Sequence, residues 1–176
     1  MRKSLRNKMY DFKETMSRIL NTVSILAVPN KEAVLGADAV TISSLVSTSV
    51  QEGEEEVMFV LRKNSHLAEK LKIGMLFSIN VLSDSQSDIA RFYGKSYPNA
   101  DGLENSVTFK WGHMNAIPIL IGSHINLTCM LEDLLVRQSS TLFFAKITGH
   151  EFIVNSHPLL HYQREYYSID GKLMNN

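Results

Sequence analysis

A series of short apolar runs, rich in β-branched and aromatic residues and separated by polar or glycine-bearing segments, constrains the fold of this chain most strongly. Runs of this length and composition are typical of β-strands. The runs are Val23–Val28, Val57–Leu61, Leu76–Leu82, Ile125–Leu131 and Leu142–Ile147. In the fourth run the apolar residues alternate with Asn126, Thr128 and Met130, and this period of two predicts a strand with one buried face.

An amphipathic helix is expected before the first strand. Within the first twenty residues, apolar side chains recur at helical spacing with charged residues between them. The apolar positions are Phe12, Met16, Ile19 and Leu20. This period predicts a helix whose apolar face packs against the core.

A second helix is expected directly after the run Val57–Leu61. It should begin at Asn64 or Ser65, where a polar side chain can cap the first turn. It should end at Gly74, because glycine adopts the left-handed conformation that ends many helices. The apolar residues expected to point inward are Leu67, Leu71 and Ile73.

A third helix is expected over residues 83–94. The spacing Ser83-x-x-Gln86 is that of a capping box, and Gly94 marks the end of the apolar pattern. Five strands with few and peripheral helices predict a mainly β, α+β domain that resembles a barrel. Alternating βαβ units are not expected.

The composition favours one ordinary globular domain. With 176 residues, the chain is long enough to form a single domain over residues 1–176. Its 18 Lys and Arg balance its 18 Asp and Glu, so neither a nucleic-acid partner nor an anionic membrane surface is expected. It has one cysteine, no secretory signal and no apolar stretch of about 20 residues. These features predict a cytoplasmic protein with no membrane partner.

The motifs of several common enzyme classes are absent. The nine glycines form neither G-x-G-x-x-G nor a Walker A sequence, so a Rossmann or P-loop nucleotide site is not expected. His157 and His161 lack the glutamate of H-E-x-x-H, so no metal site is expected. There is no G-x-S-x-G motif, and Cys129 lies in a buried-strand pattern that favours a structural role over a nucleophile.

A hydroxyl-rich strand and a basic helix start together suggest a phosphorylated ligand. Segment 39–49 carries hydroxyls at most positions between its apolar residues, and Arg62, Lys63, Asn64 and Ser65 lead into the expected second helix. Free N–H groups at a helix N-terminus attract anions, and these side chains can bond phosphate oxygens. Flavin mononucleotide (FMN) combines a polar ring edge with a phosphate. The alternatives are hydroxyls that face solvent or a neighbouring strand, and a serine cap beside a solvated basic pair.

Four segments, taken in order, are similar to a known family. They read GADAVTISSLVSTS, VMFVLRKNSHLAEKL, FSINVLSDSQSDIARFYG and HPLLHYQREYY. From about Phe12 to about Tyr167 the chain resembles the flavin-reductase-like FMN-binding split-barrel family, in particular the short reductase components of two-component flavin monooxygenases. The resemblance implies a six-stranded split β-barrel with peripheral helices. It also implies a homodimer that binds FMN or FAD near the subunit interface and uses NADH or NADPH as co-substrate.

The resemblance also implies which residues contact the cofactors. The hydroxyl segment corresponds to contacts with the flavin ring and ribityl group, the basic segment to the phosphate side, Phe92 to the flavin pocket and Tyr162 to the nicotinamide side. The expected cofactor-binding residues are Thr41, Ser43, Ser44, Ser47, Thr48, Ser49, Arg62, Lys63, Asn64, Ser65, Phe92 and Tyr162. No catalytic acid or base is expected, because hydride transfer is the chemistry of the cofactors.

The resulting hypothesis is an NAD(P)H:flavin oxidoreductase that reduces FMN or FAD by hydride transfer and passes reduced flavin to a monooxygenase or another acceptor. Many relatives have a histidine before the strand that this chain begins after Ser139 and Ser140. Because that histidine can face the nicotinamide, the alternative is an FMN-binding electron carrier without pyridine-nucleotide activity. A third alternative is an interaction module that has kept the barrel and lost the flavin.

Overall fold

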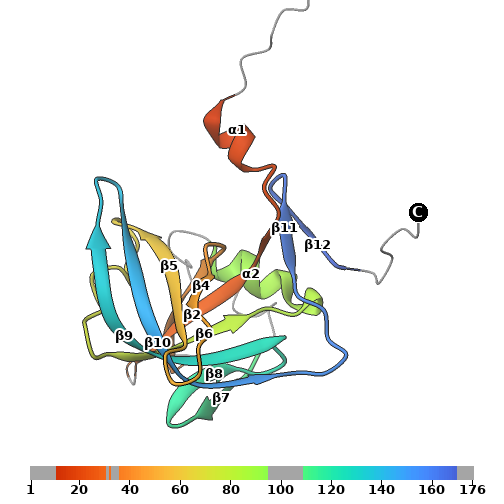
Figure 1. Cartoon of the computed structure of the whole chain (residues 1–176). Coiled ribbons are helices and arrows are strands. Elements are labelled where there is room, and N and C mark those ends of the chain that lie inside the picture. The colour runs from red at the N-terminus through yellow and green to blue at the C-terminus, as the bar shows by residue number, and fades with distance from the viewer. Residues whose placement is uncertain (1–10, 31, 33–35, 95–108, 170–176) are drawn as a thin grey trace, which may run out of the picture.

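The computed structural model describes residues 11–30, 32, 36–94 and 109–169, so the first ten residues of the expected N-terminal helix lie outside this part. The described chain is mainly β-sheet with a few short helices (Figure 1). The main sheet has seven strands in the order β3-β2-β6-β9-β10-β5-β4, and neighbouring strands are antiparallel. Its strands are β2 (Ser24–Pro29), β3 (Ala37–Ile42), β4 (Val46–Ser49), β5 (Glu56–Arg62), β6 (Leu76–Val81), β9 (Ile125–Val136) and β10 (Ser140–Phe152).

The five predicted strand runs are confirmed as β2, β5, β6, β9 and β10. The last two are longer than predicted because they form one long hairpin, whose register shifts between Phe144 and Ala145 and again between Ile147 and Gly149. The apolar residues that face inward form the core of the curled sheet. Phe59 is at its centre, with ring centroids 5.2 Å from Phe143 and 5.6 Å from Phe77. The prediction of a mainly β domain with peripheral helices is therefore confirmed.

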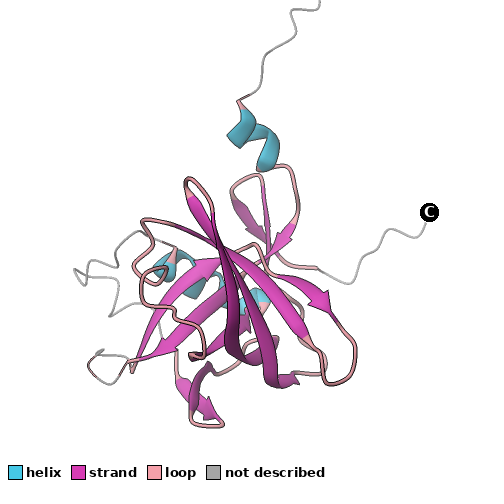
Figure 2. Cartoon of the chain, turned by 60° about the vertical axis from the view of Figure 1, so that its left-hand side comes forward, coloured by secondary structure: helices cyan, strands magenta, loops and turns pink. Residues whose placement is uncertain are grey.

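The two edges of the main sheet meet at one serine. Strands β3 and β4 are outermost in the hydrogen-bonded order, yet only residues 43–45 separate them in the sequence. The Ser44 hydroxyl accepts a hydrogen bond from the Val60 N–H at 2.9 Å and donates one to the Val60 carbonyl at 3.2 Å. This attaches the end of β3 to β5 and curls the sheet (Figure 2). The single hydroxyl-rich strand predicted over 39–49 is thus wrong, since the segment forms parts of two edge strands.

The first half of β9 is covered on both faces, which corrects the prediction of one buried face. Asn126 and Thr128, expected to face solvent, are buried, whereas Leu127 is only half-buried. The hairpin of β7 (Trp111–Met114) and β8 (Ile117–Leu120) packs against this part of the sheet. Two donors there have partners: the Asn126 amide donates to Glu151 Oε1 at 2.9 Å and the Thr128 hydroxyl to the Gly149 carbonyl at 3.3 Å, whereas the Asn126 Oδ1 is buried without a partner among the described residues.

The N-terminal helix is shorter than predicted and does not pack against the core. Helix α1 covers only Phe12–Met16, has no buried residue, and stands away from the main sheet (Figure 1). Phe12 itself is 75% exposed. The helix ends because the backbone that follows takes part in a second, small sheet of β1 (Asn21–Thr22), β11 (Leu160–Tyr162) and β12 (Glu165–Tyr167). The Gln163 N–H donates to the Ser17 carbonyl at 2.7 Å and connects this small sheet to the segment that follows α1.

Residues 63–74 form successive turns, and the helix predicted there is wrong. The Ser65 N–H bonds the Arg62 carbonyl at 2.9 Å, and similar three-residue hydrogen bonds follow at Ala68 and Lys70. Leu67 and Leu71 point inward as predicted, but Ile73 is 65% exposed. Gly74 has the expected left-handed conformation, with φ of +83°.

The third predicted helix is confirmed as a 3₁₀ turn (Asp84–Gln86) that continues into α2 (Ser87–Tyr93). The Ser83 N–H donates to Gln86 Oε1 at 3.0 Å, as in a capping box. Helix α2 buries Ile89, Phe92 and Tyr93 in a second apolar cluster against β2 and β3. No helix in the described part of the chain is both long enough and apolar enough to cross a membrane.

Candidate functional site

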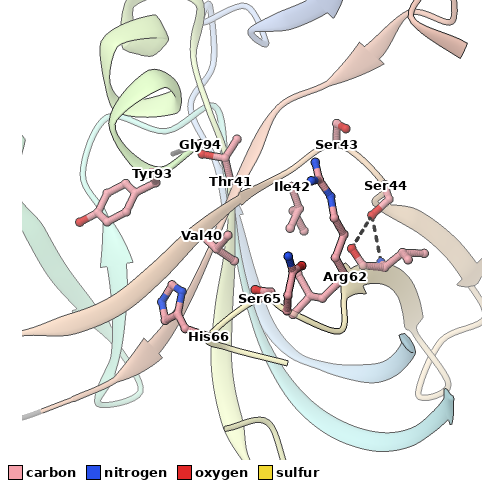
Figure 3. A pocket seen from close by; sticks show the side chains of 13 residues that line it. Val40, Thr41, Ile42, Ser43, Ser44, Arg62, Ser65, His66, Tyr93 and Gly94 are labelled. Carbon is pink, nitrogen blue, oxygen red and sulfur yellow. Dashed lines mark hydrogen bonds between the residues drawn. The ribbon is translucent and has the colours of Figure 1, made fainter. Parts of the chain in front are cut away.

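A cavity of about 340 Å³ lies where the two edges of the main sheet meet (Figure 3). Its walls come from the end of β3, the link to β4, the end of β5 with the turns that follow, and the last residues of α2. The volume is within the range of about 300–1,000 Å³ that small-molecule sites have. The lining residues are Val40, Thr41, Ile42, Ser43, Ser44, Val60, Leu61, Arg62, Asn64, Ser65, His66, Tyr93 and Gly94.

Hydrogen bonds between side chain and backbone hold the walls together. The Thr41 hydroxyl donates to the Ala90 carbonyl at 2.9 Å and attaches β3 to the last turn of α2. Ser44 attaches the end of β3 to Val60 in β5. Both hydroxyls therefore have structural partners, and their remaining capacity toward a ligand lies mainly in oxygen lone pairs.

Among the lining residues, Ser65 and Tyr93 each have a buried side-chain oxygen with no hydrogen-bond partner in the described part of the chain. The Ser65 Oγ is buried and makes no hydrogen bond with any residue that the structure describes. Buried hydroxyls almost always have a partner, because leaving one without costs free energy. Ser65, Asn64 and Arg62 all line the cavity, which therefore offers a hydroxyl, an amide and a guanidinium to an acceptor. Figure 3 shows the Arg62 guanidinium on the Ser43 side and the Ser65 hydroxyl on the Val40 side. An anionic oxygen group suits this set of donors.

A small charged cluster lies behind the His66 side of the cavity. Lys70 forms an ion pair with Asp38 of β3. Burial would raise the pKa of Asp38, but the hydrogen bonds from Lys70 and Asn30 outweigh it and hold that pKa below its ordinary value. Burial lowers the pKa of His66. The negative charge of Asp38 raises this pKa and the positive charge of Lys70 lowers it, and the net result is a pKa below the ordinary value. Burial also raises the pKa of Tyr93 well above its ordinary value, so that ring hydroxyl stays neutral.

The structure brings half of the twelve predicted binding residues to this cavity. The six that line it are Thr41, Ser43, Ser44, Arg62, Asn64 and Ser65. Since residues 63–74 form turns, the predicted helix N-terminus does not exist, and the argument for phosphate binding from free helical N–H groups is wrong. The donors that remain for an anion are the side chains of Arg62, Asn64 and Ser65.

The other six predicted residues lie elsewhere. Ser47, Thr48 and Ser49 belong to β4, where the Thr48 hydroxyl bonds Glu56 Oε1 at 2.6 Å. Lys63 is exposed, and its N–H donates to the Ser139 carbonyl at 3.1 Å. The two aromatic residues are also away from the cavity wall. Phe92 is buried against Tyr93 and Phe109, and Tyr162 of β11 contacts Tyr167, with ring centroids 6.2 Å apart.

Several lining residues escaped the sequence reasoning. His66 directly follows Ser65 and could have been found by extending the polar segment by one residue. Tyr93 and Gly94 come from the end of a helix about fifty residues beyond β3, and only the tertiary packing of α2 on β3 brings them there. Among the described residues, no group of three or more His, Cys, Asp and Glu side chains could hold a metal ion.

The fold is shared with several solved flavin reductases. The styrene monooxygenase flavin reductase SMOB from Pseudomonas putida S12 matches with a TM-score of 0.76 and 21% identity, over 90% of this chain and 97% of that one. The NADH:FAD oxidoreductase SgcE6 from Streptomyces globisporus, in complex with NAD and FAD fragments, matches with a TM-score of 0.73 and 17% sequence identity, over 88% of each chain. BorF, the flavin reductase component of a bacterial two-component tryptophan halogenase, matches with a TM-score of 0.75 and 16% sequence identity, over 89% of this chain and 94% of that one.

At these identities the solved structures show that the fold is shared and carry no further conclusion. No curated protein matches the chain by sequence. The family model named flavin reductase like domain, in contrast, matches residues 16–170, which include the three sheets of the described chain, α2 and every residue that lines the cavity. Because this match covers most of the sequence, the chain belongs to the flavin reductase-like domain family.

Proposed function

We propose that this protein is an NAD(P)H:flavin oxidoreductase that reduces FMN or FAD by hydride transfer and passes the reduced flavin to a monooxygenase or another acceptor. The observation that carries the proposal is the cavity at the sheet edges, which is lined by uncharged hydroxyls, by Arg62 and by the unpartnered Ser65 Oγ. Membership of the flavin reductase-like family supports it independently.

The residues present fit a flavin nucleotide. The buried Ser65 Oγ lacks an acceptor, and a phosphate oxygen would supply one. Arg62, which also lines the cavity, supplies a permanent positive charge. Ser43, Thr41 and the backbone beside them present neutral hydrogen-bonding groups, which suit the heteroatom edge of an uncharged ring.

In this proposal the protein positions the cofactors and excludes water. A bound flavin supplies the hydride-accepting chemistry. Arg62, Asn64 and Ser65 hold the phosphate end, while Val40, Ile42 and Leu61 provide apolar surface against the ligand. Charge that develops on the ring during reduction would be stabilised by the Ser43 hydroxyl, because the Thr41 and Ser44 hydroxyls already donate to backbone carbonyls. No side chain is required to act as a general acid or base.

The known relatives support the choice of partners. SgcE6 is by name an NADH:FAD oxidoreductase, and its structure, which has the same fold, contains bound fragments of NAD and FAD. SMOB and BorF are by name reductases of a monooxygenase and of a halogenase system. We extend these properties to the present chain as part of the proposal: FMN or FAD as cofactor, NADH or NADPH as co-substrate and a monooxygenase as receiver.

A second candidate function rests on the residues next to Arg62. Ser140 pairs with Arg62 across β10 and β5, and Ser139 precedes it at the hairpin end, so the segment where many relatives have a histidine offers only hydroxyls. An FMN-binding electron carrier without pyridine-nucleotide activity is compatible with this arrangement.

One set of measurements separates the two functions. Purified protein is supplied with FMN or FAD, its absorption spectrum is recorded, and NADH or NADPH is then added while nucleotide oxidation is followed. Flavin-dependent oxidation of either nucleotide supports the reductase. Flavin bound without nucleotide oxidation selects the electron carrier, and absence of flavin binding refutes both.

We also infer that the protein is a homodimer through the outer face of its main sheet. Register places Val46, Met58 and Phe144 in one row across β4, β5 and β10, and Val60, Leu142 and Leu135 in the next. None of these side chains is fully buried, and Val46 and Leu135 are 52% and 48% exposed. An apolar sheet face of this kind is typical of an association surface. Because Val60 also lines the cavity, a second copy would lie close to the ligand.

Replacing Phe144 by glutamate tests this interface. A charge in the centre of the face should convert a dimer into a monomer, because an unpaired charge in an apolar interface is strongly unfavourable. Light scattering after size-exclusion chromatography gives the mass of the wild type and of the variant. A monomeric wild type would refute the dimer.

A further inference from the structure

Three ionisable side chains line the cavity among the residues that the structure describes: Arg62, His66 and Tyr93. Arg62 keeps its charge at any ordinary pH. Tyr93 is buried and keeps its proton. His66 is therefore the one lining residue whose charge can change near neutral pH.

His66 lies at the end of the cavity that fits an anion. It directly follows Ser65, whose buried Oγ lacks a partner, and Figure 3 shows the two side chains on the same side of the cavity next to Val40. A phosphate that accepts a hydrogen bond from Ser65 would lie close to the His66 ring. The imidazole is half-buried, so solvent screens its interaction with such an anion only in part.

The charged groups around His66 set its state before a ligand binds. The carboxylate of Asp38 from β3 favours the protonated ring, whereas the ammonium of Lys70, in the turns after β5, disfavours it. Arg62 at the end of β5 adds a further positive charge to the cavity. Burial disfavours the charged ring most, so the pKa of His66 lies below its ordinary value. At neutral pH the ring is mainly neutral. An anion beside it would favour the charged form and raise that pKa.

We propose that His66 is a proton-dependent recognition residue for the phosphate of the flavin, and that it strengthens the binding of phosphate-bearing flavin as the pH falls from 8 toward 6. This inference rests on the proposed function, because it assumes that the cavity takes a flavin. Binding and protonation are linked, so each unit by which the bound phosphate raises the pKa of His66 makes binding to the protonated ring about tenfold tighter than to the neutral one.

The experiment compares two ligands and three proteins. FMN carries the phosphate and riboflavin lacks it, so the ratio of their dissociation constants isolates the phosphate contribution. His66→Gln keeps a hydrogen-bonding side chain but cannot take up a proton. His113→Gln is the matched control, because His113 is exposed on β7 and does not line the cavity. The FMN phosphate itself changes protonation at about pH 6, so each variant is compared with the wild type at the same pH.

The expected result is a preference for FMN over riboflavin that is severalfold larger in the wild type than in His66→Gln at pH 6, where part of the free ring is still neutral, and nearly equal in the two at pH 8. His113→Gln should behave as the wild type at both values. Equal preference in the wild type and His66→Gln at both pH values would overturn the role of His66 and leave the flavin site intact. Failure of the wild type to bind either flavin would instead overturn the proposed function, and this inference with it.

A second measurement covers the case in which His66→Gln does not fold. Calorimetric titration of the wild type with FMN, in two buffers with different ionisation enthalpies, gives the number of protons taken up on binding. Uptake at pH 7 that is larger for FMN than for riboflavin supports the proposal. Equal uptake for the two ligands contradicts it.

Discussion

Replacing Arg62 by alanine tests whether the cation of the cavity holds a phosphate. Hydrogen bonds to charged groups are worth about 1.5–3 kcal/mol, and the lower end applies here because the Arg62 side chain is exposed to solvent. A loss of about 1.5 kcal/mol corresponds to about a tenfold weaker binding of FMN. Riboflavin has no phosphate, so its dissociation constant should change little.

The neighbouring residue provides a matched control for this prediction. Lys63 carries the same charge and is equally exposed, but it does not line the cavity, and its N–H bonds the Ser139 carbonyl. Lys63→Ala should therefore bind FMN nearly as well as the wild type, and quenching of flavin fluorescence measures the dissociation constants of FMN and riboflavin for the wild type and both variants. If Arg62→Ala weakened FMN and riboflavin equally, Arg62 would act on the fold and not on a phosphate. If the two variants weakened FMN equally, the general charge of the segment would be responsible.

Two further predictions concern the core. Asn80 is fully buried, and its side chain accepts a hydrogen bond from the Leu120 N–H at 2.8 Å and donates one to the Ile25 carbonyl at 3.0 Å. Asn80→Ala leaves both backbone groups without this partner, so it should lower the free energy of unfolding, measured in urea, by about 2–4 kcal/mol. Asn21→Ala, which removes only an exposed bond to Ile19, should cost less than about 0.5 kcal/mol, and equal losses would contradict this account. Burial raises the pKa of Cys129 to about 12 from an ordinary value of 9.0, so the folded thiol keeps its proton where the unfolded one loses it. The free energy of unfolding should therefore fall as pH rises above about 9, and a Cys129→Ala variant with the same slope as the wild type would show that other groups cause the fall.

Strands could be predicted from the sequence because their signal is local. β-branched and aromatic runs such as Val57–Leu61 and Leu142–Ile147 are strands whatever lies beside them. The length of the β9–β10 hairpin was not predictable in the same way, because Asp133 continues the strand only through its pairing with Phe144 of β10, and Glu132 is the residue skipped at the register shift beside it.

Helices were harder to predict because they compete with other uses of the same backbone. Leu67 and Leu71 have helical spacing and are buried as expected, and the Leu71 N–H even bonds the Leu67 carbonyl at 3.1 Å, yet this single helix-type bond is not continued and the segment around it consists of turns. A short helix is costly to nucleate, and this segment is held at both ends instead: the Lys63 N–H bonds the Ser139 carbonyl, and the Gly74 N–H bonds the Leu131 carbonyl. Spacing therefore predicted which residues are buried, but not the backbone conformation that buries them.

The candidate site divides along the same line. Thr41, Ser43 and Ser44, and likewise Arg62, Asn64 and Ser65, are close neighbours in sequence, so composition alone marked both groups. What composition could not show is where the hydroxyl segment leaves the cavity. Ser44 turns its hydroxyl to Val60, and the chain then continues as β4 on the far edge of the sheet, which carries Ser47, Thr48 and Ser49 away.

The closure at Ser44 explains why one short segment provides both a structural contact and a ligand surface. A sheet edge has unpaired N–H and C=O groups that must find partners. At the Val60 position the partner is a side chain and not another strand, so the two edges stay attached while their backbones diverge and leave a cavity between them. A continuous strand pair there would satisfy the same backbone groups and would fill that space. The hydroxyls after Thr41 are therefore not interchangeable. The Ser44 hydroxyl attaches the edges through a side chain, which leaves the cavity open, and the Ser43 hydroxyl, which is exposed at the rim, remains available to a ligand.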